Sequence, residues 1–423
     1  MTTSVFGWLD QDDQTRNQML EIIDLFREQG ILDELGTAQI RDAFSDRFFP
    51  GITTIQTRVR YFLFVPWIHI IVDGEGRTGR DAQRRERELH AHLVQSLRTG
   101  NEADTGIIGI RAGESLQRLP GGIYWTGLSA WGIRRSTESV ERYDEKRHLA
   151  NHGDDDAEVA ESGELLSGAS RYWHRGMPKP PEGLFEQTSF ELTLEEAEFL
   201  QERVIDSCSG TLLEACVSGK VGNIESASFP WDLDGLDNLD QTLGEDIEHA
   251  RKFALLAEGA INLYNLMLAE RSSEFEIGGS DPDQLEENER RVAEYTDRFT
   301  RWAHEIIAER DALLAWDRDA FWDRVRDLRP TLSPATTHFF EAWMNLAISD
   351  PEALPRSDDA RRLISNRERR RKGSLARLHY LRPLERWSGS SGLGRMTYRW
   401  PNARPHVIDI LDGLERGSGD DRA

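Results

Sequence analysis

The chain has 423 residues, too many for one ordinary domain, and its 75 acidic and 52 basic residues give a formal net charge of −23. Apolar residues make up 38% of the sequence, which is enough for hydrophobic cores. No apolar run reaches the roughly 18 residues of a membrane span, and no basic stretch followed by an apolar one marks a secretory signal. We therefore expect no membrane association and a cytoplasmic location.

The first residues predict three helices, at 13–29, at 37–48, and from Thr53 or Thr54 to about residue 71. This layout allows a helix-turn-helix-like reading in which Thr54, Gln56, Arg58 and Arg60 face DNA. From Tyr61 onward the third helix is apolar nearly all round, which favours a buried central helix instead. In that reading Arg58 and Arg60 pair with nearby acids or serve a local polar site.

The middle of the chain mixes helices with irregular segments. A helix is expected at 84–97, and glycines then alternate with aromatic residues over 116–133, where Tyr124 and Trp125 predict core or a pocket wall. Acidic residues with scattered glycine and serine predict an exposed loop or linker at 136–170. Three aspartates there are a weak calcium signal, and the histidine pair beside them is a weak metal signal.

The later part of the sequence predicts a series of helices. Thr193 and Glu196 form a capping-box pattern ahead of a helix at 194–204. Long periodic helices follow at 243–269 and 285–315, and shorter ones at 316–326 and 334–348. Strands are expected to be few and short, with the best candidate at 397–400. The fold class is therefore mainly α and multi-helical, with Cys208 and Cys216 as small buried residues.

These elements predict four parts along the sequence. Residues 1–135 form an N-terminal helical domain, 136–170 the acidic loop or linker, and 171–350 a second helical domain. Residues 351–423 form a basic C-terminal segment that packs on the rest. This last part differs from the remainder in charge, because residues 356–404 hold fourteen basic but only four acidic side chains.

Such a segment is typical of surfaces that bind phosphate. Arginine forks pair with phosphate oxygens and release counterions, and the interleaved aromatic rings can stack on unpaired bases. An equally weighted alternative is that the segment docks onto the acidic remainder of the chain or onto an acidic partner. The candidate residues for binding nucleic acid or a partner are Arg367, Arg369, Arg370, Arg371, Lys372, Arg377, Arg395, Tyr398, Arg399 and Trp400, with Arg58, Arg60 and Arg118 as secondary candidates.

Recognised catalytic motifs are missing from the sequence. It contains no HExxH, GxSxG, Walker A or strand-linked GxGxxG pattern, so no catalytic residue, metal ligand or cofactor is predicted. Carboxylates are so frequent in this chain that pairs of them carry no information. A scattered nuclease site of acidic residues stays open as an alternative.

Nine short runs along the chain form a recognisable set: Asp33–Gly36, Ile40–Ala43, Phe49–Gly51, Gln56–Trp67, Arg118–Pro120, Ile123–Trp125, Tyr398–Trp400, Asp409–Ile410 and Gly413–Leu414. Together these runs resemble an uncharacterised prokaryotic domain-of-unknown-function family whose members are of about this length. The resemblance implies genes that lie near helicases and phospholipase-D-like nucleases in defence islands. It supplies no catalytic residues.

The expected function is an accessory, non-enzymatic component of a prokaryotic defence or DNA-processing assembly. It would bind DNA, or a helicase or nuclease partner, through the basic C-terminal face. A metal-dependent hydrolase or nuclease and a purely protein-binding scaffold are the alternatives.

Overall fold

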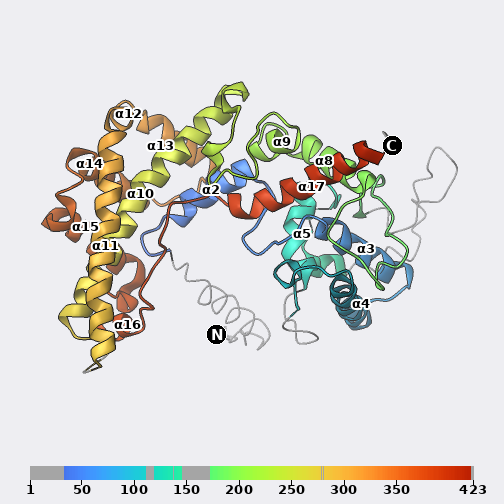
Figure 1. The fold of residues 1–423 in the computed structure, drawn as a ribbon, viewed down its shortest axis with the longest axis horizontal. Helices are drawn as coiled ribbons and strands as arrows, with labels where there is room; N and C mark the ends of the chain where they lie inside the picture. Colours follow the sequence, from blue (N-terminus) through green and yellow to red (C-terminus); the bar gives the residue numbers. More distant parts are fainter. Residues whose placement is uncertain are drawn as a thin grey trace, which may run out of the picture. The chain divides into compact units, whose positions relative to one another are not determined.

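The computed structural model describes residues 33–110, 119–136, 138–144, 172–277, 279 and 281–420. The chain forms two compact units (Figure 1), each built from segments that are distant in sequence. One unit comprises Met1–Arg41 and His249–Met396, and the other comprises Asp42–Glu248 and Thr397–Ala423. Over the described residues the fold is helical, with isolated bridges but no strand, so the predicted mainly α class is confirmed.

The unit that contains residues 249–396 is built around the long helix α10. Its helices and turns are α10 (Gln241–Glu274), α11 (Pro282–Ala308), α12 (Arg310–Leu314), α13 (Arg318–Leu328), α14 (Pro334–Ser349), η5 (Leu354–Arg356), α15 (Asp358–Lys372), η6 (Gly373–Leu375) and α16 (Leu381–Glu385). Two buried indoles tie its helices together, because Trp302 of α11 and Trp343 of α14 donate to the carbonyls of Leu255 and Leu256 at 2.7 and 2.8 Å. The predicted helices of this region are confirmed with shifted ends, except that the single helix expected at 285–315 is divided at Glu309 into α11 and α12.

The unit that contains residues 42–248 is closed by the C-terminal helix. Its helices and turns are α2 (Ala38–Phe48), α3 (Tyr61–Gly74), α4 (Gly79–Thr99), η1 (Asp104–Gly106), α5 (Pro120–Ala130), α8 (Leu194–Ser207), α9 (Leu212–Val217), η3 (Pro230–Asp232), η4 (Leu236–Asn238) and α17 (Trp400–Asp420). Helix α17 packs against α8 and α9. A Cβ at Gly413 would lie 2.7 Å from that of Ala197, so glycine permits this close approach.

Three local predictions in this unit are confirmed. Thr193 and Glu196 form both hydrogen bonds of the capping box at the start of α8. Residues 61–69 of α3 are all buried, as expected for a central helix. Cys208 and Cys216 are buried free thiols, also as expected.

The predicted start of α3 is wrong. The helix begins at Tyr61, because side chains take the backbone groups of the preceding residues. The Gln56 amide donates to the carbonyl of Gly51 at 3.0 Å and accepts from the Thr53 N–H at 3.2 Å. The Tyr124 hydroxyl accepts from the Thr57 N–H at 2.9 Å. The four residues proposed to face DNA therefore lie in an irregular segment rather than on a recognition helix.

The strand expected at 397–400 is also wrong. Tyr398 and Arg399 have φ angles of 49° and 65°, the left-handed region, so the chain turns directly into α17. The first predicted helix, most of the acidic loop and Arg118 lie outside the described residues. No helix in the described part of the chain is both long and apolar enough to cross a membrane.

Candidate functional site

Helix α15 carries the densest part of the basic segment. Ser357 caps its N-terminus by accepting from the Ala360 N–H, and the last turn holds four basic residues that face the negative end of the helix dipole. One face is buried through Ala360, Ile364, Arg367 and Glu368. The helix therefore points some basic side chains into the unit and others into solvent.

Four basic residues form what we name the inner basic group: Arg367, Arg371, Lys372 and Arg377. Arg367 is the most deeply placed of them, with 6% of its surface exposed. Its guanidinium donates to the carbonyl of Leu35 at 2.8 Å and to the hydroxyl of Thr336 at 2.8 Å. Burial and the nearby charge of Arg371 lower the pKa of Arg367 to about 10. This guanidinium anchors the backbone at residue 35 and is withdrawn from any external phosphate.

The other three members of the inner basic group pair with Asp33 and Glu34. Arg371 donates to Asp33 Oδ2 at 3.0 Å, and Arg377 donates to Glu34 Oε1 at 2.8 Å. Lys372 forms an ion pair with the same Glu34 carboxylate. Two carboxylates thus pair with three basic side chains, which is the kind of internal docking expected as the alternative to nucleic-acid binding.

A buried polar network extends from this pairing. Glu368 is fully buried and accepts hydrogen bonds from the Tyr264 hydroxyl at 2.6 Å and from the backbone N–H groups of Arg377 and Leu378 at 2.7 and 2.9 Å. Burial raises the pKa of the Tyr264 phenol, as does the adjacent carboxylate. The network fixes the path of the chain after α15.

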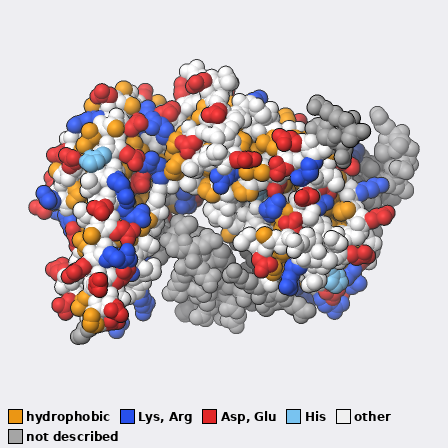
Figure 2. Space-filling view, in the orientation of Figure 1, with side chains coloured by type: hydrophobic (Ala, Val, Ile, Leu, Met, Phe, Trp, Pro, Cys, Tyr) orange, Lys and Arg blue, Asp and Glu red, His pale blue; other side chains and the backbone are white. Residues whose placement is uncertain are grey.

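The outer arginines are Arg369, Arg370, Arg382 and Arg386, all of which are exposed. Within the described part of the chain no carboxylate lies within ion-pair distance of any of them, and Arg369 donates a long hydrogen bond of 3.4 Å to the side-chain oxygen of Asn366. Figure 2 shows acidic and basic side chains interspersed over the visible face of the molecule. The outer arginines are thus four exposed charges without an ion-pair partner among the described residues.

The remaining candidates of the basic segment are engaged internally. Arg395 bridges Glu258 and Glu305 at 2.8 and 2.6 Å. In the other unit, Arg399 donates to Asp46 Oδ1 at 2.5 Å and to the carbonyl of Ile52 at 3.0 Å. Each of these guanidiniums holds structural elements together.

The two aromatic candidates are core residues. Tyr398 is 0% exposed and lies edge-on to Phe44 and Phe48 at ring distances of 6.0 and 5.9 Å. Trp400 is 1% exposed, and its indole N–H donates to the carbonyl of Ala227 at 2.8 Å. Neither ring face is open to a base. The exposed aromatic residue of the segment is Tyr380, which was not among the candidate site residues.

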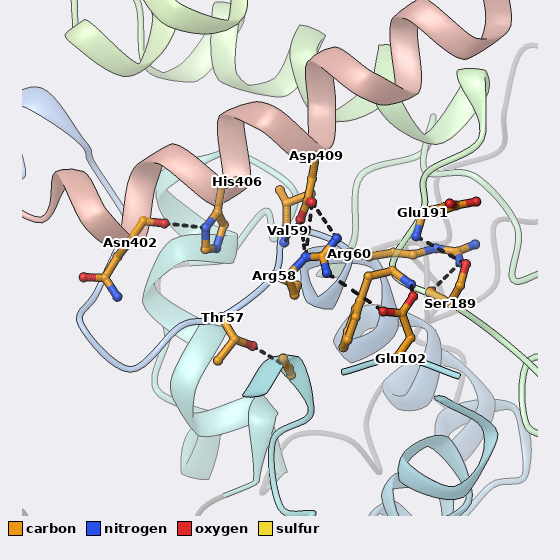
Figure 3. Close-up of polar contacts among 12 residues, drawn as sticks. Thr57, Arg58, Val59, Arg60, Glu102, Ser189, Glu191, Asn402, His406 and Asp409 are labelled. Carbon is orange, nitrogen blue, oxygen red and sulfur yellow. Dashed lines mark hydrogen bonds and ion pairs between the residues drawn. The ribbon is translucent and has the colours of Figure 1, made fainter. Parts of the chain in front are cut away.

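Arg58 belongs to a second polar cluster, in the unit that contains residues 42–248 (Figure 3). Its guanidinium donates to both oxygens of Asp409 on α17, at distances from 2.7 to 3.1 Å. The backbone N–H of Val59 donates to the same carboxylate at 3.2 Å. Glu102 lies 4.0 Å from Arg58 on another side. The cluster fastens α17 to the segment before α3.

Two buried residues extend this cluster. Arg60, 4% exposed, donates to Glu196 Oε1 of α8 at 2.7 Å and to the carbonyl of Ser189 at 2.8 Å. His406 of α17 donates through Nδ1 to the carbonyl of Asn402 at 2.7 Å. Burial lowers the pKa of His406 to about 4, so the ring is neutral near pH 7. Arg58 and Arg60 are thus paired with acids, although the partners are remote in sequence.

The described residues contain no group of three or more His, Cys, Asp or Glu side chains placed to hold a metal ion. Burial raises the pKa of the Cys208 thiol to about 12 and that of Cys216 still further, so neither supplies a thiolate near neutral pH.

The paired acids were missed from sequence because no local pattern marks them. Asp409 is 351 residues from Arg58, and Asp33 is 338 residues from Arg371. The division of α15 into two faces did have a signal, since Ala360, Ile364, Arg367 and Arg371 recur at helical spacing.

Comparison with known proteins places the chain in a family but assigns no activity. Neither the curated proteins nor the solved structures contain a match. The model of one family, described as a family of unknown function (DUF6361), matches residues 3–413. Because this match covers nearly the whole sequence, the chain belongs to the family of unknown function DUF6361.

Proposed function

We propose that the protein is an accessory, non-enzymatic component of a DNA-processing or defence assembly and that it binds DNA through the outer arginines. The observation that carries this proposal is the contrast within one segment. The inner basic group is matched by Asp33, Glu34 and backbone carbonyls, whereas the outer arginines are exposed without a carboxylate partner among the described residues. The guanidinium of an exposed arginine can donate two parallel hydrogen bonds to the oxygens of one phosphate group.

The negative charge of the rest of the chain favours the outer arginines as the place where DNA binds. With a net charge of −23, most of the surface repels a polyanion, so binding is favoured where positive charge is locally unopposed. Sequence-independent contacts to phosphate also suit an accessory role, because they supply affinity without requiring catalytic groups. The neighbouring helicase and nuclease genes implied by the resemblance supply the expected protein partners.

The test is the salt dependence of DNA binding, measured by fluorescence anisotropy with a labelled oligonucleotide. Replacing both Arg369 and Arg370 by alanine should weaken binding and lower the slope of log K against log salt by roughly 1.4 for a single strand or 1.8 for a duplex. These two residues give a cleaner test than a triple change with Arg371, which is held by Asp33.

The matched control removes two exposed arginines from the same unit. Arg290 and Arg326 are 62% and 57% exposed and each pairs with an acid three residues away. Alanine at both lowers the charge by the same amount and should leave the slope unchanged. Equal binding by wild type and the Arg369/Arg370 variant would refute the proposal. Metal-dependent cleavage of the DNA would favour the hydrolase alternative.

A further inference from the structure

The outer arginines flank a group of exposed apolar side chains. Among the described residues, the large hydrophobic side chains that are exposed number seven, and three of them, Leu375, Tyr380 and Leu381, fall within residues 375–381. They are 67%, 47% and 42% exposed. Such clustering in seven residues is not expected of isolated surface apolar groups, which scatter singly.

The structure connects this apolar group to α15. The ring of His379 lies beside Ser365 of α15, with Nε2 2.9 Å from its hydroxyl. The ring of Tyr380 lies 6.5 Å from that of His379. Arg369 is one helical turn beyond Ser365, so it lies on the same face of α15 as this contact. The exposed phenol of Tyr380 and the exposed guanidinium of Arg369 thus belong to one region of the unit.

We propose that this region is a site for single-stranded DNA, in which the outer arginines hold the backbone and Tyr380 stacks on an unpaired base. The inference rests on the proposed function and goes further by naming the form of the nucleic acid. Phosphate contacts alone do not separate single strands from duplexes, but an exposed ring can stack on a base that has no partner. An acidic protein partner would satisfy the arginines but has no need of the aromatic surface.

The charge and the aromatic side chains of this region also restrict the kind of ligand that it can bind. Glu385 is the one acidic residue between Arg369 and Arg386, so the region keeps a positive balance. In the same segment Trp387, Tyr398 and Trp400 are buried, which leaves Tyr380 as the ring available for stacking. A single exposed ring predicts one stacked base and little sequence preference.

The experiment compares an oligo-dT of about 20 nucleotides with a hairpin duplex of equal length, by anisotropy at about 0.1 M salt. We expect the wild type to bind the single strand more tightly than the hairpin. Tyr380→Ala should weaken binding of the single strand about tenfold, the loss of one stacked base, and leave binding of the hairpin unchanged. Tyr380→Phe keeps the ring and should bind as the wild type does.

Phe275 provides the matched control, because it is 43% exposed in the same unit and also has an arginine, Arg271, 4.6 Å from its ring centre. Phe275→Ala should bind both probes normally. Equal affinity for both probes, or no change in Tyr380→Ala, overturns the single-strand site while leaving DNA binding intact. Failure to bind either probe, with capture of polyglutamate instead, overturns the proposed function itself.

Discussion

Arg60 and Arg369 bring the same guanidinium group into opposite surroundings. Arg60 is 4% exposed and donates to Glu196 and to a backbone carbonyl, whereas Arg369 is exposed and contacts Asn366 at 3.4 Å. A buried guanidinium must be matched by acceptors because desolvation is costly, so it contributes to folding and has little left for a ligand. The number of arginines in a segment therefore does not indicate how many phosphate groups that segment can bind.

The largest expected effect is the difference in the free energy of unfolding lost when Arg60 or Arg369 is replaced. Arg60→Met leaves the buried carboxylate of Glu196 unpaired and should lower the free energy of unfolding by about 4 kcal/mol, measured by urea denaturation. Arg369→Met should change it by less than about 0.5 kcal/mol.

The double variant Arg60→Met/Glu196→Gln tests the cause. It removes both charges while the amide oxygen can still accept from the Thr193 N–H, so it should recover much of the loss. A double variant no more stable than Arg60→Met would show that the charge of Glu196 is not the source of the penalty.

The second largest effect concerns the pH dependence of stability, which reports whether water is excluded from His406 in the cluster around Arg58. Burial lowers the pKa of His406 to about 4, against 6.5 in the unfolded chain, while the Asp409 charge opposes that shift. The unfolded state therefore takes up the proton first, and the stability that His406 contributes is complete above pH 6.5 and lost as the pH falls toward 4. The loss should amount to about 3 kcal/mol.

Urea denaturation between pH 7 and pH 4 measures this dependence. His406→Gln should flatten part of the curve, and the buried His90, whose pKa burial also lowers to about 4, should account for a further part. A curve for His406→Gln that parallels the wild type would contradict a dry site at this position.

A smaller effect concerns the inner basic group. Gly36 has a φ of +90°, and a Cβ there would lie 2.2 Å from Nη2 of Arg367. Leu35 and Thr336 hold that guanidinium in place, so it cannot move aside freely. Gly36→Ala should cost about 2 kcal/mol of stability in thermal or urea unfolding, through backbone strain and the clash.

Gly210 has a φ of +71° and no atom within 4 Å of an added Cβ. Gly210→Ala therefore separates the two causes, because it carries the backbone strain alone. If both variants lose the same stability, the contact with Arg367 contributes nothing.

The smallest expected effect is a gain in affinity for DNA when one paired arginine loses its carboxylate partner. Asp33→Asn removes the carboxylate that neutralises Arg371, whose side chain is 35% exposed. One added phosphate contact should tighten binding of single-stranded DNA about fivefold at 0.1 M salt. Anisotropy with the oligo-dT probe measures this, and Asp359→Asn, which frees Arg362 at the other end of α15, is the control for charge alone. Equal gains in both variants would show that charge and not position is responsible.

Much of the local structure could be predicted from sequence. Helical periodicity located most of the helices, and the pattern of Thr193 and Glu196 predicted a cap that the structure confirms. The same reasoning failed at residues 53–60, because the side chains of Gln56 and Tyr124 compete for backbone groups that a helix would use. It failed again at Tyr398, where a left-handed turn leads into α17.

A mainly helical protein with a concentration of arginine near its C-terminus can be predicted from the sequence, because both properties depend on neighbouring residues. Which of those arginines are neutralised depends on the tertiary fold. Asp33, Glu34 and Asp409 reach their partners across more than 330 residues of chain, and each unit is assembled from distant segments. Net charge is a property of composition, but neutralisation depends on the distance between two charges in space. The interaction energy of a charge pair falls with that distance, so a sum of charges along the sequence cannot predict which arginines are neutralised.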